Sequence, residues 1–182
     1  REALHQWLAR GGETIVETGC VRQADDWLGA GMSTVVFADY ITQHGGYLSS
    51  IDNDPAHIEL ARSLVGEADV IFEEGDSVEI LRDWGAEIDL LYLDSLDYPL
   101  GELLDIYGGK DDLDAAKATL WAISDAEIIA RHGPIIAACQ EHCADEVRAA
   151  LPWAKSLILM DDAALPGGGK ARLARVVLAA AG

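Results

Sequence analysis

Five acidic residues lie at or just after the ends of short apolar runs: Glu17, Asp52, Asp76, Asp94 and Asp161. Carboxylates accept hydrogen bonds from hydroxyl and amino groups, and grouped carboxylates bind divalent cations. When strands run parallel, their last residues meet at one edge of the sheet, where ligands of open α/β sheets bind. The pattern therefore predicts a pocket at that edge for a ligand rich in hydroxyl and amino donors.

The elements that position these acids follow from the hydrophobic pattern. Apolar runs alternate with segments of helical spacing, which predicts an α/β fold with a doubly wound, mainly parallel sheet. The expected strands are residues 14–18, 48–52, 69–73, 88–93 and 157–160. The expected helices are residues 2–9, one opening at Ser33 or Thr34, one opening at Asp54-Pro55, one after Ser77, one carrying Ala115 to Ile128, residues 135–150 and residues 171–180.

A less regular segment, residues 96–133, is expected to form a lid-like insertion over the strand edge. No internal repeat or low-complexity tract is present, so residues 1–182 are expected to form a single domain.

Charge narrows the classes of partner. The chain has 13 Lys and Arg against 32 Asp and Glu, a formal net charge of −19. Such a surface repels phosphate backbones and anionic lipids, so we expect neither nucleic-acid nor membrane partners. No apolar stretch approaches the roughly 18 residues of a membrane span. We expect a cytoplasmic protein with reduced cysteines, and a homodimer is compatible with the sequence.

The order of these features resembles the class I S-adenosylmethionine-dependent methyltransferases over residues 12 to about 176. The resemblance rests on Glu17-Thr18-Gly19, on Asp52, on Gly75-Asp76-Ser77 and on Leu91-Tyr92-Leu93-Asp94. The tail from Leu157 to Lys170, with an Asp-Asp pair and a Pro-Gly-Gly-Gly-Lys loop, is similar to that of small-molecule O-methyltransferases.

The sequence departs from the family in two places. The usual Gly-x-Gly-x-Gly loop is reduced to Gly19 followed by a longer excursion to Gly29 and Gly31. The chain also ends after its fifth strand and one helix, whereas the family closes its sheet with a hairpin of two further strands. We therefore expect either a shortened member or a chain that has lost its C-terminal part.

The resemblance implies a role for each matching position. Glu17 and Gly19 would lie near the methionine part of the cofactor, and Ser33 and Thr34 near its carboxylate. Asp52 would bind both ribose hydroxyls, Asp76 with Ser77 nearby would bind the adenine amino group, and Asp94 would lie next to the reacting methyl.

The residues alone support part of this assignment. Asp52 at a strand end fits the ribose of any nucleotide, including NAD, but no Gly-x-Gly-x-x-Gly follows the first strand. Any single acid can instead be the N-cap of the next helix, and Asp76 and Asp54 are the clearest cases.

Asp94, Asp161 and Asp162 suggest a cation. Three carboxylates at neighbouring strand ends cannot all stay ionised without one, and Mg²⁺ prefers oxygen ligands. Bound Mg²⁺ would acidify a substrate hydroxyl, and the resembled metal-dependent O-methyltransferases hold their ion with acids at these places. In the alternative interpretation, Asp161-Asp162 caps a turn and Asp94 only lines the cofactor site.

His142 is the candidate general base, because its pKa suits proton transfer near neutrality and similar sequences often carry a histidine there. The alternative is a packed or solvated helical histidine. Cys139, His142 and Cys143 share a helical face, but structural zinc needs four ligands, so small buried thiols are the preferred interpretation.

The sequence thus predicts methyl transfer from S-adenosylmethionine to a hydroxyl of a small polar acceptor, such as a sugar or a natural product. Two alternatives stay open. The first is aminopropyl transfer on the same fold, and the second is a degenerate domain that binds the cofactor or a partner without catalysis.

Overall fold

The structure is a computed structural model of residues 1–182 and describes residues 2–25 and 32–182. The predicted glycine loop through Gly29 and Gly31 lies outside the described residues. The chain divides into two compact units, residues 1–95 with 148–160 and residues 96–147 with 161–182. Each unit is built from two separate stretches of chain and need not fold alone, so this division leaves the expectation of a single domain untested.

The first unit contains a five-stranded sheet in the order β3-β2-β1-β4-β5. All four neighbouring pairs are parallel, which confirms the predicted α/β class with a Rossmann-like, doubly wound arrangement. The strand order reverses where β1 meets β4, because the chain first builds outward through β2 and β3 and then crosses to β4. The strands are β1 (Thr14–Thr18), β2 (Tyr47–Asp52), β3 (Val70–Glu74), β4 (Ile88–Leu93) and β5 (Ala154–Met160).

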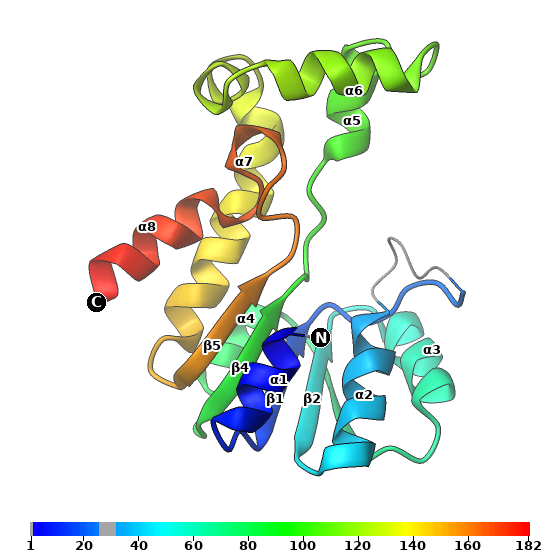
Figure 1. Cartoon of the computed structure of the whole chain (residues 1–182), viewed down its shortest axis with the longest axis vertical. Helices are drawn as coiled ribbons and strands as arrows, with labels where there is room; N and C mark the ends of the chain where they lie inside the picture. The colour runs from blue at the N-terminus through cyan, green and yellow to red at the C-terminus, as the bar shows by residue number, and fades with distance from the viewer. Residues whose placement is uncertain (1, 26–31) are drawn as a thin grey trace. The chain divides into compact units, whose positions relative to one another are not determined.

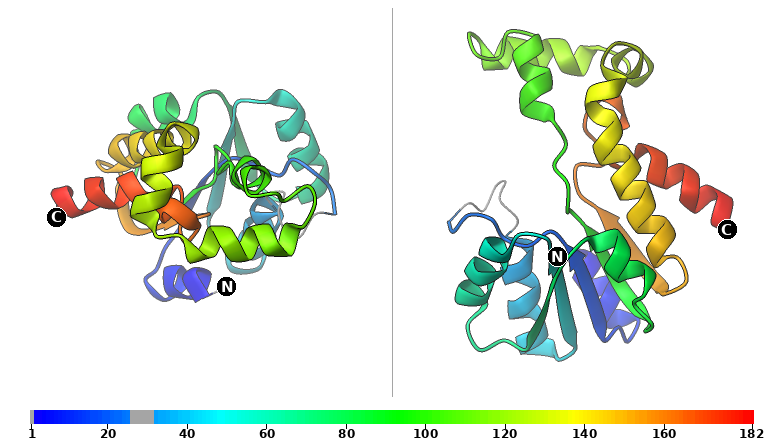
Figure 2. Two further views of the ribbon diagram at one scale, coloured as in Figure 1. Left: turned by 90° about the horizontal axis from the view of Figure 1, so that it is seen from above. Right: turned by 180° about the vertical axis from the view of Figure 1, so that it is seen from behind.

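Helices cover both faces of this sheet. The helices are α1 (Glu2–Ala9), α2 (Ser33–His44), α3 (Pro55–Val65) and α4 (Ser77–Arg82). Figures 1 and 2 show α1 and α2 on one face and α4 on the other. Ile15, Leu48 and Leu90, from three strands, pack with Trp7 of α1 and Phe37 of α2. Strands that are covered on both faces are mostly apolar, as β4 is at its fully buried Ile88, Leu90 and Leu91.

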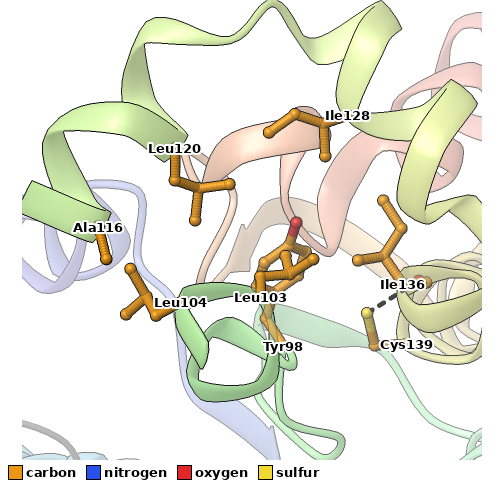
Figure 3. Close-up of a cluster of buried hydrophobic side chains, with 8 residues drawn as sticks. All are labelled: Tyr98, Leu103, Leu104, Ala116, Leu120, Ile128, Ile136 and Cys139. Atoms are coloured by element: carbon orange, nitrogen blue, oxygen red, sulfur yellow. Dashed lines mark hydrogen bonds between the residues drawn. The ribbon is translucent and has the colours of Figure 1, made fainter. Parts of the chain in front are cut away.

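The second unit is mostly helical. Its elements are α5 (Leu100–Ile106), α6 (Leu113–Ala122), most of α7 (Asp125–Ala150), a short 3-10 turn η1 (Pro166–Gly168) and α8 (Ala171–Ala181). Figure 3 shows its core, in which α5, α6 and α7 bring together Leu103, Leu120, Ile128 and Ile136 around Tyr98. The lid-like insertion is therefore α5, α6 and the start of α7, and its action as a lid stays a prediction.

Two helix predictions in this region are wrong. Residues 115–128 form parts of two helices, because the chain breaks at Ile123-Ser124, where Ser124 Oγ accepts a bond from Glu127 N–H. Helix α7 does not begin at Gly133-Pro134 but runs through Pro134. Ile128 and Ile136 both pack in the same core, so burial continues across Pro134 and outweighs the one lost backbone bond.

No helix among residues 2–25 and 32–182 is both long and apolar enough to cross a membrane.

Candidate functional site

Glu17 is the most deeply buried acid at the carboxyl end of the sheet, with no exposed surface. Ser33 Oγ donates to its Oε1 at 2.7 Å and Ser50 Oγ donates to its Oε2 at 3.0 Å. Burial raises the pKa of Glu17 from 4.5 to about 7, against the lowering effect of hydrogen bonds from Ser33, Thr34 and Ser50, and the charge of Asp94 raises it further. Near neutral pH this carboxyl therefore exchanges between its protonated and ionised forms.

Asp52 ends β2 and is 8% exposed. Its Oδ2 accepts a hydrogen bond from Cys20 N–H at 3.0 Å, and its Oδ1 accepts one from Asp54 N–H at 2.8 Å. His57 Nδ1, on α3, lies 3.2 Å from the same Oδ1. These contacts fix the orientation of the carboxylate. Oδ2 keeps a lone pair for a ligand hydroxyl, and Oδ1 can accept a second hydroxyl in place of His57.

Gly19 brings the turn after β1 against the end of β4. Its φ is +80°, and a Cβ there would lie 2.4 Å from the backbone oxygen of Asp94. Gly19 N–H donates to Ile51 O at 2.8 Å, while Asp94 N–H donates to Thr18 O at 2.9 Å. Only glycine fits both the conformation and the space, as the sequence predicted from its place after the first strand.

Ser33 and Thr34 open α2, as predicted, but neither caps it, because the N-cap is Met32 and no side chain bonds there. The structure gives both hydroxyls internal partners. Ser33 donates to Glu17, and Thr34 Oγ1 accepts from Val21 N–H at 3.2 Å. Both residues thus hold the loop and the acid of the site in place, and a contact with a cofactor carboxylate stays a prediction.

Asp76 is the N-cap of α4, because its Oδ1 accepts a hydrogen bond from Glu79 N–H at 3.0 Å. Asp54 caps α3 in the same way, through Ala56 N–H at 2.8 Å. The alternative capping interpretation therefore applies to both residues. A role of Asp76 and the buried Ser77 in binding adenine stays a prediction.

The proposed Mg²⁺ ligands lie in different units, Asp94 in the first and Asp161 and Asp162 in the second. The positive group near Asp162 is Lys170, which is 2% exposed and whose Nζ lies 3.9 Å from Asp162 Oδ2. Burial raises the pKa of Asp162, and the charge of Lys170 lowers it. Among the residues that the structure describes, no group of three or more His, Cys, Asp or Glu side chains could hold a metal ion. The magnesium hypothesis therefore gains no support from the structure.

His142 lies on α7 in the second unit, with its Nε2 3.5 Å from Oε1 of the buried Glu146. Its action as a base stays a prediction. Cys139 and Cys143 are buried on the same helix, and burial raises the pKa of both thiols, that of Cys143 to about 12. Neutral buried thiols agree with the preferred interpretation of these cysteines.

Sequence reasoning missed Ser50 and His57. The adjacent Ser49 and Ser50 within a buried strand were the available signal for Ser50, because buried hydroxyls need a partner. His57 lies three residues after Asp54, one helical turn into α3, which was the signal that it could reach back toward the strand end.

No protein-family model matches the sequence, and a comparison with curated proteins finds no significant similarity. The function is therefore argued from the geometry of the site.

Proposed function

We propose that the chain is an S-adenosylmethionine-dependent methyltransferase acting on a hydroxyl oxygen of a small polar acceptor in the cytoplasm. One observation carries the proposal. At the reversal of strand order between β1 and β4, the first unit places the buried Glu17, the close turn at Gly19 and the oriented Asp52 together. Open α/β sheets bind nucleotide-like ligands at this position.

The donor set fits an adenosyl group. Backbone N–H groups hold both oxygens of Asp52 in place. The carboxylate can accept hydrogen bonds from two neighbouring ribose hydroxyls, the one on Oδ1 replacing the contact with His57. In its ionised form, the buried Glu17 carries negative charge next to the turn at Gly19, which suits a ligand with an amino group.

When bound, the cofactor supplies a methyl group on a positively charged sulfur. The protein contributes mainly by holding the acceptor oxygen in line with that methyl, because alignment of the reacting atoms lowers the barrier to the transfer. We propose that Asp94 or His142 removes the proton from the acceptor hydroxyl. Activation of the same hydroxyl by Mg²⁺ is a separate proposal.

Calorimetric titration of S-adenosylhomocysteine into the full chain tests the proposal. We expect micromolar binding to the unchanged protein and roughly a tenfold or greater loss in Asp52→Ala, because a desolvated pair of charge-assisted bonds disappears. Asp39→Ala is the control, since Asp39 is an exposed acid of α2 bonded only to Gln43 among the described residues. Asp52→Asn, which keeps the shape, guards against a misfolded alanine variant.

Two further arms sharpen the result. Titrations with and without Mg²⁺ show whether the ion contributes to binding. Methylthioadenosine binding without S-adenosylhomocysteine binding would favour aminopropyl transfer. No heat and no thermal shift from either nucleoside would overturn the proposal.

A further inference from the structure

We propose that the second unit contains a binding pocket for a neutral carbohydrate or a similar polyhydroxylated ring. The pocket is a cavity of about 300 Å³ whose wall includes Trp121, Asp125, Pro166, Gly168 and Arg175. All of its lining residues belong to the second unit, and the proposal does not depend on methyl transfer. A cavity of this volume is large enough for a small ligand.

Trp121 supplies a flat apolar surface. It is 49% exposed, whereas the preceding residue, Leu120, is fully buried in the core of Figure 3. Helix α6 thus turns one side toward the core and leaves the indole at the cavity. One face of a pyranose ring consists of C–H groups, and these pack on an indole face, whose amphipathic character suits a ligand that is apolar on one face and wet on the other.

The turn η1, which also lines the cavity, is held by buried hydrogen bonds. The buried Gln140 donates from Nε2 to Gly167 O at 3.1 Å and to Gly169 O at 2.9 Å, and Tyr98 Oη donates to Pro166 O. Fully bonded buried networks fix one conformation. Gly169 cannot be replaced, because a Cβ would lie 1.9 Å from a backbone oxygen. A pre-formed wall lowers the ordering cost of binding a weakly held ligand.

Two charged side chains of the cavity are anchored by hydrogen bonds and keep further acceptor or donor groups for a ligand. Asp125 Oδ1 accepts from Gly167 N–H at 2.8 Å, and Arg175 Nη2 donates to Ala163 O at 3.0 Å. Within residues 2–25 and 32–182, each side chain makes this one hydrogen bond. The second oxygen of Asp125 can therefore accept from a ligand, and the other guanidinium N–H groups of Arg175 can donate to it. A carboxylate acceptor beside a guanidinium donor matches adjacent sugar hydroxyls, which both donate and accept.

The lining favours no net charge on the ligand. One acid and one base line the cavity, so the attraction of an ion to one of them is offset by repulsion from the other. The net charge of −19 repels anions further. A neutral, hydroxyl-rich molecule is the class that fits both the charges and the indole.

Saturation-transfer NMR on the full chain tests the pocket, using a mixture of D-glucose, D-galactose, D-mannose, N-acetyl-D-glucosamine and L-rhamnose. We expect saturation of ring C–H protons of at least one sugar, with millimolar affinity measured by titration. Trp121→Ala should weaken that affinity roughly tenfold, and Trp121→Phe should weaken it less, because a flat ring remains. Arg175→Met should also weaken it.

Leu113→Ala is the matched control, because Leu113 lies on the same helix, is 48% exposed and does not line the cavity. It should leave the affinity unchanged, and circular dichroism confirms the folding of each variant. Absence of saturation for all five sugars, or equal binding by folded Trp121→Ala, would overturn the proposal. Binding of 4-hydroxybenzoate in place of the sugars would assign the pocket to aromatic acids and would equally overturn it.

Discussion

Glu17 combines complete burial with a carboxyl pKa of about 7, against an ordinary value of 4.5. The folded protein therefore binds this proton more tightly than the unfolded chain does. The resulting stability is fully present below pH 4.5 and is lost as the pH rises through 7, which amounts to roughly 3 kcal/mol. Glu17→Gln cannot ionise, so its free energy of unfolding should fall less across this window than that of the unchanged protein.

Urea unfolding at a series of pH values measures this difference. Glu13→Gln is the control, since Glu13 is an exposed acid four residues earlier, and its profile should follow that of the unchanged protein. Parallel profiles for Glu17→Gln and the unchanged protein would contradict the prediction.

Gly19 and Gly66 allow the conformational cost of adding a side chain to be separated from the cost of a steric clash. Both have positive φ, +80° and +63°, but a Cβ at Gly66 meets open space, whereas one at Gly19 meets the backbone oxygen of Asp94 at 2.4 Å. Gly66→Ala should lower the free energy of unfolding by about 2 kcal/mol, because the backbone of Gly66, at φ +63° and ψ −125°, lies in a region that favours glycine. Gly19→Ala adds a backbone clash and should cost about 3 kcal/mol or more. Chemical denaturation of both variants measures the costs, and equal values would show that β4 shifts freely.

At this scale the sequence predicts the residues of the site better than their contacts. Glu17, Gly19 and Asp52 were located by their places at strand ends, since that signal is local. The bond from Ser50 to Glu17 was not, because it depends on the β1–β2 register that places these two residues opposite one another. Register is set by the packing of the whole sheet.

Among the elements, α4 depends most on its cap. It has only six residues, and the side chain of Asp76 satisfies the N–H of Glu79 at its first turn. Asp76→Ala should therefore destabilise the protein by about 1 kcal/mol, and Asp76→Ser should restore most of the loss. Thermal melts of the two variants measure this. If both lose stability equally, the carboxylate acts through something other than the cap.

The same element-scale reasoning explains which helix boundaries the sequence predicted. Asp54-Pro55 marks the start of α3 by local chemistry, a side-chain cap followed by proline at the first helical position. The prediction of a helix start at Pro134 was wrong because proline favours the first turn of a helix only locally. Burial of Ile128 and Ile136 in one core keeps α7 continuous through Pro134. Local rules predict boundaries only where tertiary packing does not oppose them.

For the molecule as a whole, the alternation of strands and helices predicted a parallel sheet but left the strand order open. The order β3-β2-β1-β4-β5 requires the crossover through α4 to reach the opposite face from α2, as Figures 1 and 2 show. No local pattern in residues 75–87 indicates the face of the sheet on which this crossover lies. It follows from the need to cover both faces of a buried sheet, a property of the assembled layers.

The net charge of −19 makes salt dependence a property of the whole molecule. Repulsion among surface carboxylates acts over about 10 Å at 0.1 M salt and destabilises the compact state. Raising NaCl from low to molar concentration should therefore raise Tm by several degrees, about 2–4 °C for each kcal/mol of repulsion removed.

Differential scanning calorimetry at several NaCl concentrations measures the effect, with sucrose as a non-ionic control. The double variant Glu67→Lys/Glu87→Lys replaces two exposed acids of the first unit and lowers the net negative charge. Because the repulsion is smaller, its Tm should start higher at low salt and rise less. If salt raised both proteins equally, the stabilisation would come from the general effect of salt on apolar burial and not from screening.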